Sequence, residues 1–376
     1  MIQKVRDYTT KETFLENINE KLKPVVDAIL DEIWKKNDFK TLRFRKILAL
    51  SFTAFFILFL IISVFVITTF STAALALSII DIILLISAVV SGMFWLWKRR
   101  DIKYSIQRAL NIHQLYKLAF SLLNANIQYI NEDIDKDIYK LMYKDIYKDM
   151  YEDIEDIEDI DEDSFPYLSQ SELSLHNLLI RRGYDFFKSH GSKKLVLHSK
   201  HNASFECATW IKEVVVQDKI VSTSYAYTTV IKIDTSQIRD PFDFFMSESS
   251  LFDFSNYAGM KKIKLENSNF NKEFNMRAYN ELKTFQMLTP LAMENMVQRK
   301  MDSNGVDVKD LKILSTGNFL YIGFVTRKEE VFRDRFSFFL TLNKEVMSQR
   351  IVDQISQAVY NIYYPISIMQ IPIYID

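Results

Sequence analysis

A long apolar stretch near the start of the chain constrains its fold more than any other feature. Residues Ile47 to Phe70 contain no charged side chain, and residues Thr72 to Trp97 contain only one, Asp81. As a helix, each part would be about 36 Å long or more, enough to cross a hydrocarbon core of about 30 Å. The link around Ser71 is short, so we expect a transmembrane hairpin (spans 47–70 and 73–97) rather than two buried helices of a soluble protein.

Basic residues flank this stretch at both ends and are missing from the link between its halves. Cytoplasmic flanks of membrane helices carry an excess of Lys and Arg, so the pattern predicts an orientation. Trp95 and Trp97 fall at the inner boundary, where aromatic rings prefer the headgroup level. We expect a multi-pass protein of the cell membrane, with both termini in the cytoplasm and no cleaved signal peptide. The basic residues are Lys35, Lys36, Lys40, Arg43, Arg45 and Lys46 before the first span, and Lys98, Arg99, Arg100, Lys103 and Arg108 after the second.

Asp81 allows two interpretations. An ionisable side chain inside a bilayer is costly and commonly functional, which would make Asp81 a proton or ion site. Alternatively, the second span starts near Leu77, so that Asp81 lies about one turn below the outer surface and reaches water. We favour the second interpretation, because two helices supply few partners for a transport pathway.

Composition excludes several classes of function. The chain has 376 residues with a formal net charge of −1, which lacks the basic excess of a nucleic-acid binder. A single cysteine, Cys207, rules out an intrachain disulfide framework. With only 7 glycines, glycine-rich phosphate loops are not expected.

Helical patterns border the hairpin. Residues 1–46 are expected to form an amphipathic cytoplasmic helix, in which Thr9 and Glu12 fit a capping box and Pro24 should kink or divide the helix. It would pack on the soluble domain or a partner, or lie along the inner leaflet. Its apolar residues, three or four positions apart, are Phe14, Ile18, Leu22, Val25, Ile29 and Ile33.

Residues 98–164 are expected to form a helical linker. From Asp137 onwards they repeat Asp-Ile-Tyr-Lys and then acidic Asp-Ile-Glu units up to Asp163. Such low-complexity sequence is typical of a solvated spacer.

Residues 165–376 have the composition of a globular domain. Strands and helices mix without regular alternation, which predicts an α+β cytoplasmic domain with a largely antiparallel sheet, tethered to the hairpin. The clearest signal is a hairpin with a two-residue Gly-Asn turn. The expected helices are 173–188, 281–301 and 343–360, and the expected strands are 194–198, 204–216, 220–234, 259–266, 274–278, 311–316 and 319–326, with a Phe-rich loop at 235–258.

The segment from Leu265 to Met296 resembles the core motif of a bacterial family of unknown function, the 3137 family, and Phe14 to Pro24 is similar to its opening helix. Members of that family combine an N-terminal helix, a transmembrane hairpin and a cytoplasmic α+β domain, so the resemblance implies architecture and no chemistry. Relative to the family plan, the acidic repeat is an insertion. The matching residues are Leu265, Glu266, Phe270, Phe274, Leu288, Thr289, Pro290, Met293 and Met296. By residue type most of these are packing residues, and only Glu266 and the neighbouring Asn280 are polar enough to do more.

No motif predicts catalysis or a cofactor. His198, His201, Glu206 and Cys207 lie close in sequence, but their spacing matches no standard zinc pattern, so no metal site is expected. Walker, dinucleotide, HExxH and G-x-S-x-G motifs do not occur. Cys207 falls in an expected strand, where a structural thiol is commoner than a nucleophile.

The predicted function is a non-enzymatic, membrane-anchored scaffold or binding module without a cofactor. Its partners would be the lipid bilayer and another membrane or cytoplasmic protein, and no nucleic acid. The alternative is a transport or channel component that oligomerises around Asp81. An exposed Phe-rich loop would suit a partner, although the same residues suit a core. The candidate partner-binding aromatics are Phe242, Phe244, Phe245, Phe252 and Phe254.

Overall fold

The computed structural model describes most of the chain, which consists of two compact units. The first unit comprises Met1–Leu22, His113–Asp334 and Val352–Asp376, and the second comprises Lys23–Ile112 and Arg335–Ile351. These limits differ from the predicted domain boundaries, because the first residues of the chain and the segment after Ile112 belong with the sheet. The described residues are 8–36, 39–69, 74–123, 127–130, 165–169, 172, 175–180, 183–198, 200–216, 219–237, 243–248, 259–316, 318–326 and 343–373.

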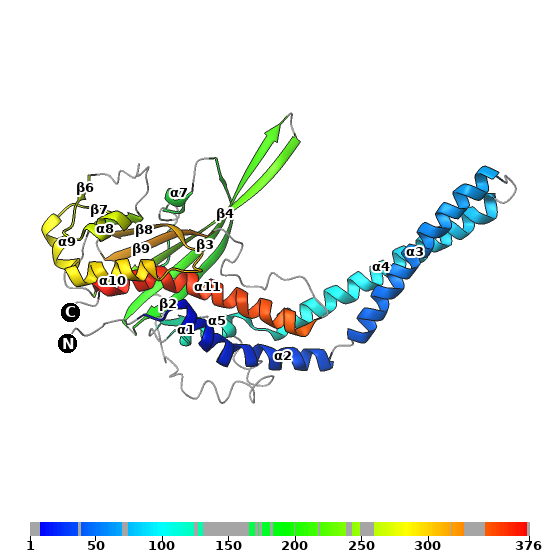
Figure 1. Cartoon of the computed structure of the whole chain (residues 1–376), viewed down its shortest axis with the longest axis horizontal. Helices are drawn as coiled ribbons and strands as arrows, with labels where there is room; N and C mark the ends of the chain where they lie inside the picture. The colour runs from blue at the N-terminus through cyan, green and yellow to red at the C-terminus, as the bar shows by residue number, and fades with distance from the viewer. Residues whose placement is uncertain are drawn as a thin grey trace. The chain divides into compact units, whose positions relative to one another are not determined.

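An antiparallel sheet forms the centre of the first unit (Figure 1). The nine described strands follow the order β1-β2-β3-β4-β9-β8-β5-β7-β6, and each neighbouring pair is antiparallel. The predicted α+β class with a largely antiparallel sheet is therefore confirmed. The strands are β1 (Ile127–Ile130), β2 (Asp185–Leu197), β3 (His201–Val216), β4 (Lys219–Asp234), β5 (Phe244–Glu248), β6 (Lys261–Ile263), β7 (Phe274–Ala278), β8 (Lys309–Thr316) and β9 (Phe319–Thr326).

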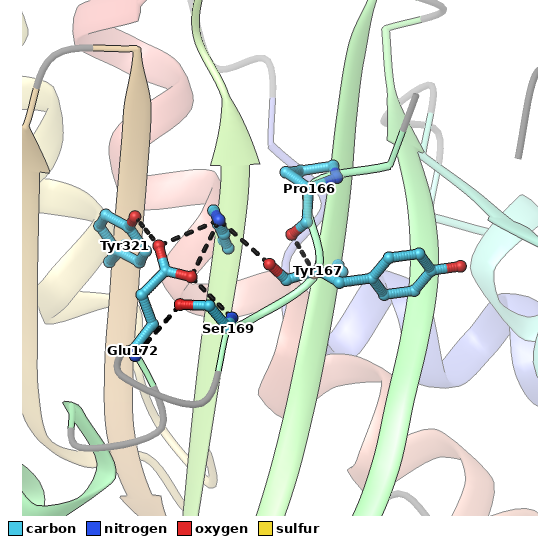
Figure 2. A network of polar contacts seen from close by, with 7 residues as sticks. Pro166, Tyr167, Ser169, Glu172 and Tyr321 are labelled. Carbon is cyan, nitrogen blue, oxygen red and sulfur yellow. Dashed lines mark hydrogen bonds and ion pairs between the residues drawn. The ribbon is translucent and has the colours of Figure 1, made fainter. Parts of the chain in front are cut away.

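The two faces of the sheet carry different residues. Strand pairing places Phe205, Ile231 and Ile322 on one face, and all three side chains are fully buried. The other face carries Lys232 and Tyr321, which lie under the segment that precedes β2. Figure 2 shows α11 (Lys344–Ile373) on the far side of the strands from that segment. The sheet is thus covered on both faces, with its main apolar core on the helical side.

The remaining helices of the first unit begin at side-chain caps where the sequence offers one. Asn267, Asn280 and Thr289 each accept a hydrogen bond from a backbone N–H in the first turn of the helix that follows. Pro290 takes the first position of α10, where its missing N–H costs nothing. The helices are α1 (Lys11–Asn17), α5 (Ile112–Ser121), α7 (Leu175–Leu179), α8 (Ser268–Glu273), α9 (Glu281–Met287) and α10 (Pro290–Met301).

The second unit contains two long apolar helices. They are α3 (Phe39–Thr69) and α4 (Ala74–Ala109), and they pack against each other. α2 (Lys23–Lys36) contacts α4, and Lys344 at the start of α11 forms an ion pair with Asp31 of α2 at 2.7 Å. Both apolar helices extend well past the limits predicted from composition, because charged residues continue each helix beyond its apolar part.

The N-terminal helix adapts to Pro24 without breaking. The turn before the proline, Ile18–Leu22, is π-helical, and α2 follows it directly. A wider turn is a common solution where a proline lacks its N–H and crowds the preceding carbonyls. The cap is Thr10 and not the predicted Thr9, whose hydroxyl instead donates to the carbonyl of Leu123.

Several predicted elements need correction. The expected helix 173–188 is mostly wrong, since α7 covers only Leu175–Leu179 and β2 begins at Asp185. The Phe-rich loop contains β5, and the linker contains β1, which pairs with β2. The single helix expected at 281–301 is two helices, because Thr289 and Pro290 start a new one. The acidic repeat and the hairpin tip around Ser71 lie outside the described residues.

Candidate functional site

Helices α3 and α4 expose apolar side chains along much of their length. The structure has two helices long and apolar enough to cross a membrane, over Phe39–Phe65 and Ile79–Ala109. Ile57, Phe65 and Ile83 are 53%, 73% and 57% exposed. In a soluble core these side chains would be buried, whereas in a bilayer their exposure to lipid is favourable. At the basic end of α4, the guanidinium of Arg99 lies 5.5 Å from the Trp95 ring, and Trp97 is exposed.

Ser63 and Asp81 are two of the polar residues within this apolar pair. Asp81 lies about two turns into α4, and Ser63 lies about two turns before the end of α3, so both are near the tip of the hairpin. Ser63 is buried, and its hydroxyl has no hydrogen-bond partner among the described residues. One carboxylate oxygen of Asp81 is likewise enclosed and without a partner in the described chain. Both side chains therefore retain hydrogen-bonding capacity that the described residues do not use.

The predicted partner-binding aromatics lie partly in the core. Phe244 and Phe245 are buried in β5, which pairs with β7 and β8, so their side chains are not available to a partner. For these two residues the prediction is corrected, and the core interpretation holds. Phe242, Phe252 and Phe254 lie outside the described residues.

The residues of the family-like motif contribute to core packing and to helix capping. Phe270 and Phe274 contact each other with ring centroids 5.0 Å apart, although Phe274 starts a strand and does not continue the helix. Thr289 and Pro290 start α10, while Glu266 is exposed. The motif therefore helps to build one edge of the sheet unit. Its buried apolar members are Leu265, Phe270, Phe274, Leu288, Met293 and Met296.

A polar network fastens the segment around Glu172 to the sheet (Figure 2). The ammonium group of Lys232 donates to Glu172 at 3.1 Å and to the carbonyl of Tyr167 at 3.0 Å, and the Tyr321 hydroxyl also donates to Glu172. Burial by itself would raise the pKa of Glu172, but hydrogen bonds from Tyr321, Ser169 and Lys232 outweigh it and hold that pKa at about 2. Because Glu172 and Lys232 satisfy each other, this network has a structural role and holds the segment around Glu172 against the sheet.

Arg299 is the most unusual charged residue of the first unit. Its side chain is fully buried between α10, α11 and Tyr8, with no ion pair to a carboxylate among the described residues. Nε donates to Ser367 at 2.7 Å, Nη2 donates to Tyr360 at 3.1 Å, and Nη1 has no partner in the described chain. Four tyrosine rings surround the guanidinium at 4.5 to 5.6 Å, those of Tyr8, Tyr360, Tyr363 and Tyr364. Ring faces therefore replace the missing counter-charge.

The tyrosine cluster also holds the start of the chain. The Thr9 N–H donates to the Tyr363 hydroxyl at 2.8 Å, and the Tyr360 hydroxyl donates to the Thr9 carbonyl at 3.0 Å. Burial raises the pKa of the Tyr364 hydroxyl to about 12 and raises those of Tyr360 and Tyr363, so the cluster carries no negative charge at neutral pH. The cluster therefore holds the start of the chain against α11.

Buried histidine and cysteine side chains have structural partners. His176 Nδ1 and Trp210 Nε1 both hydrogen-bond the Thr228 hydroxyl at 2.8 Å, and burial lowers the pKa of His176 to about 4. Cys207 is buried against Thr229, and Glu206 accepts a hydrogen bond from Ser189. Within the described ranges, no group of three or more His, Cys, Asp or Glu residues comes together as a metal site.

Sequence reasoning missed Arg299 and Lys232, although each left a signal. Arg299 follows Ala292 and Met296 at helical spacing on the buried face of α10. Lys232 alternates in phase with buried Val230 of β4. A single basic residue at an apolar position of a periodic pattern indicates that its side chain is buried. The sequence does not identify its partners, because they come from distant segments of the chain.

Comparison of the chain with models of protein families, with curated proteins and with solved structures finds no match.

Proposed function

We propose that this protein is a membrane-anchored, non-enzymatic scaffold or binding module. The observation that carries the proposal is the exposure of the apolar side chains along both α3 and α4. A pair of helices with this surface needs a non-aqueous environment, and a lipid bilayer supplies it. The sheet unit is then the part that meets other molecules.

The proposed orientation places both termini and the sheet unit in the cytoplasm, with the hairpin crossing the cell membrane twice. Support comes from the basic residues at the open end of the hairpin and from the aromatic residues Trp95 and Trp97 beside them. The architecture agrees with the resemblance to the 3137 family, which we retain as a proposal. The polar clusters support a non-enzymatic role, because those around Glu172 and Arg299 tie segments of the chain together.

Cysteine labelling tests this topology. Ser71 belongs to the predicted link between the two spans, and Asn304 is an exposed residue of the sheet unit. A membrane-impermeant maleimide applied to right-side-out membranes should therefore label Ser71→Cys and not Asn304→Cys. In inside-out membranes the pattern should reverse. Labelling of Asn304→Cys from outside, or extraction of the protein by alkaline carbonate, would contradict the proposal.

A second candidate function is a transport or channel component that oligomerises around Asp81. The unsatisfied oxygens of Asp81 and Ser63 favour it, because a further helix could satisfy both. Asp81→Asn should abolish ion or proton flux through such an assembly and should leave a scaffold's binding unchanged. Flux that is present in the wild type and lost in Asp81→Asn would favour this candidate over the first.

A further inference from the structure

The basic end of the helix pair brings cations from both helices to one level. α3 and α4 pack against each other and are joined by a short link, so they run antiparallel (Figure 1). Arg45 stands as far before the end of α3 as Lys98 stands after the start of α4, and Arg99 follows directly. Residues equally far from the link lie side by side, because both helices rise by about 1.5 Å per residue. Arg45, Lys98 and Arg99 therefore share one level of the pair.

Arg45 lies on the side of α3 that faces α4. The less exposed positions in this part of α3 recur three or four residues apart, and they include Leu42, Arg45, Ala49 and Phe52. Among the described elements α3 makes its main contact with α4, so this row of residues lines the seam between the two helices. Nη1 of Arg45 is enclosed in the seam and has no hydrogen-bond partner among the described residues.

α4 contributes two further cations to the seam. The side chain of Lys98 is 28% exposed, and Arg99 is half-buried with its guanidinium 5.5 Å from the Trp95 ring. Lys98 forms an ion pair with Asp101 at 3.3 Å, and Asp101 is the one acidic residue between Trp95 and Lys103. The three cations at this level thus have a single carboxylate beside them, which leaves an excess of positive charge.

The acidic residues of the neighbouring helices interact with other cations. α3 contains no acidic residue, and α2 is the other described helix that contacts α4. On α2, Asp31 pairs with Lys344 at 2.7 Å, and Glu32 pairs with Lys36 at 3.5 Å. Asp27, the remaining acid of α2, also interacts electrostatically with Lys344. The excess charge of the seam therefore favours an anion from outside the chain.

A phosphate group has the chemistry and the position that this seam requires. The planar donors of a guanidinium match phosphate oxygens. In a bilayer Trp95 and Trp97 would lie at the headgroup level, where lipid phosphates are found. A zwitterionic headgroup carries a cation of its own, which the excess positive charge would repel. An anionic phospholipid carries no such cation and is attracted by basic residues near the membrane surface.

We propose that the seam at Arg45, Lys98 and Arg99 binds the phosphate of an anionic phospholipid. The enclosed Nη1 of Arg45 donates to a phosphate oxygen, and the two cations of α4 complete the site. A free phosphate offers the same oxygens, but the acyl chains of a lipid hold its phosphate at the level of the seam. The assignment rests on the proposed membrane anchor and adds a lipid class to it.

Native mass spectrometry of the full chain tests the assignment. The protein is equilibrated in mixed micelles that hold equal amounts of phosphatidylglycerol and phosphatidylcholine with the same acyl chains, and the bound lipids are counted. We expect phosphatidylglycerol to be enriched on the wild type. Arg45→Gln and Arg99→Gln should each lower this enrichment about fivefold, the effect of one basic residue near a membrane surface.

Lys46→Gln is the matched control. It removes the same charge at nearly the same depth, but Lys46 is exposed and lies outside the row that lines the seam, so the enrichment should change less than about twofold. Equal losses in Arg45→Gln and Lys46→Gln would show a diffuse attraction of lipid and would overturn the proposal. So would a wild type without enrichment. Inorganic phosphate that binds as often as the lipid, and is lost in Arg45→Gln, would assign the site to a free anion.

Carbonate extraction of membranes that contain the same variants separates this proposal from the membrane anchor. A wild type that resists extraction but shows no enrichment refutes the lipid site alone. A wild type that carbonate extracts refutes the anchor, and the lipid site with it. Arg45→Gln and Arg99→Gln should resist extraction and keep the wild-type circular dichroism spectrum. If Arg45→Gln loses that spectrum, the enrichment on Arg99→Gln decides the outcome.

Discussion

Arg299 shows how a buried charge can be held without an acid. Its two hydrogen bonds and four tyrosine contacts come from the start of the chain and from α11, so the guanidinium joins segments remote in sequence. A guanidinium can reach several partners at once in a fixed plane, which an ammonium cannot. The stability of the protein should therefore depend on the shape of the side chain at position 299 as well as on its charge.

Substitution of Arg299 should separate these contributions. Arg299→Lys keeps a buried charge but loses the planar guanidinium with its several donors, and we expect the free energy of unfolding to fall by about 2–4 kcal/mol. Arg299→Met removes the charge together with its bonds and should cost less, because no desolvated cation remains. Thermal unfolding of both variants checks this order. A lysine variant more stable than the methionine variant would contradict the role given to the planar guanidinium.

His176 should make stability depend on pH. Its pKa is about 4 in the folded state because of burial, against 6.5 in the unfolded chain, so the unfolded state binds more protons between these values. Stability is full above about pH 6.5 and falls as the pH drops towards 4, by about 3 kcal/mol in all. His176→Gln should flatten this slope in denaturant titrations at several pH values.

At the level of helices and strands, the predictions were correct where the local sequence pattern was strong. β8 and β9 pair as the predicted hairpin, and β7 has the predicted limits. The misassigned segments were 173–188 and the Phe-rich loop, because their apolar residues have no clear period. There, pairing with distant strands decided the structure, as Phe244 pairs with Ala278 and Ser315.

The cap of α10 provides a local test. Thr289 accepts a hydrogen bond from the Ala292 N–H at 3.2 Å, so Thr289→Ala should destabilise the protein by about 1 kcal/mol. For a domain of this size the melting temperature should fall by about 2–4 °C. Thr289→Ser should restore it, while Glu266→Ala at an exposed motif position should have no effect. An unchanged melting temperature in Thr289→Ala would show that the cap is dispensable.

At the level of the whole molecule, the exposed apolar residues of α3 and α4 are the basis of the proposed membrane anchor. Leu58 in α3 and Ile83 in α4 are 55% and 57% exposed. An arginine at the centre of a membrane helix costs about 2.5–3.5 kcal/mol on insertion. The double variant Leu58→Arg/Ile83→Arg should therefore shift protein from the carbonate-resistant membrane fraction to the soluble or aggregated fraction. Met301→Arg, at an exposed position of the sheet unit, should stay in the membrane, and retention of the double variant there would contradict the anchor.

Local composition and period were enough to predict the apolar helix pair, the α+β class and most strands. The tertiary structure was needed to show which segments join the sheet unit, since Tyr8 and β1 reach it through contacts with residues far along the chain. It also decided that Phe244 and Phe245 are core residues and that Arg299 has tyrosines for partners. Apolar residues look alike in sequence whether they face a core or a partner, so only packing distinguishes the two. For the helix pair, tertiary structure added the exposure of its apolar side chains, which identifies it as a surface and not a core.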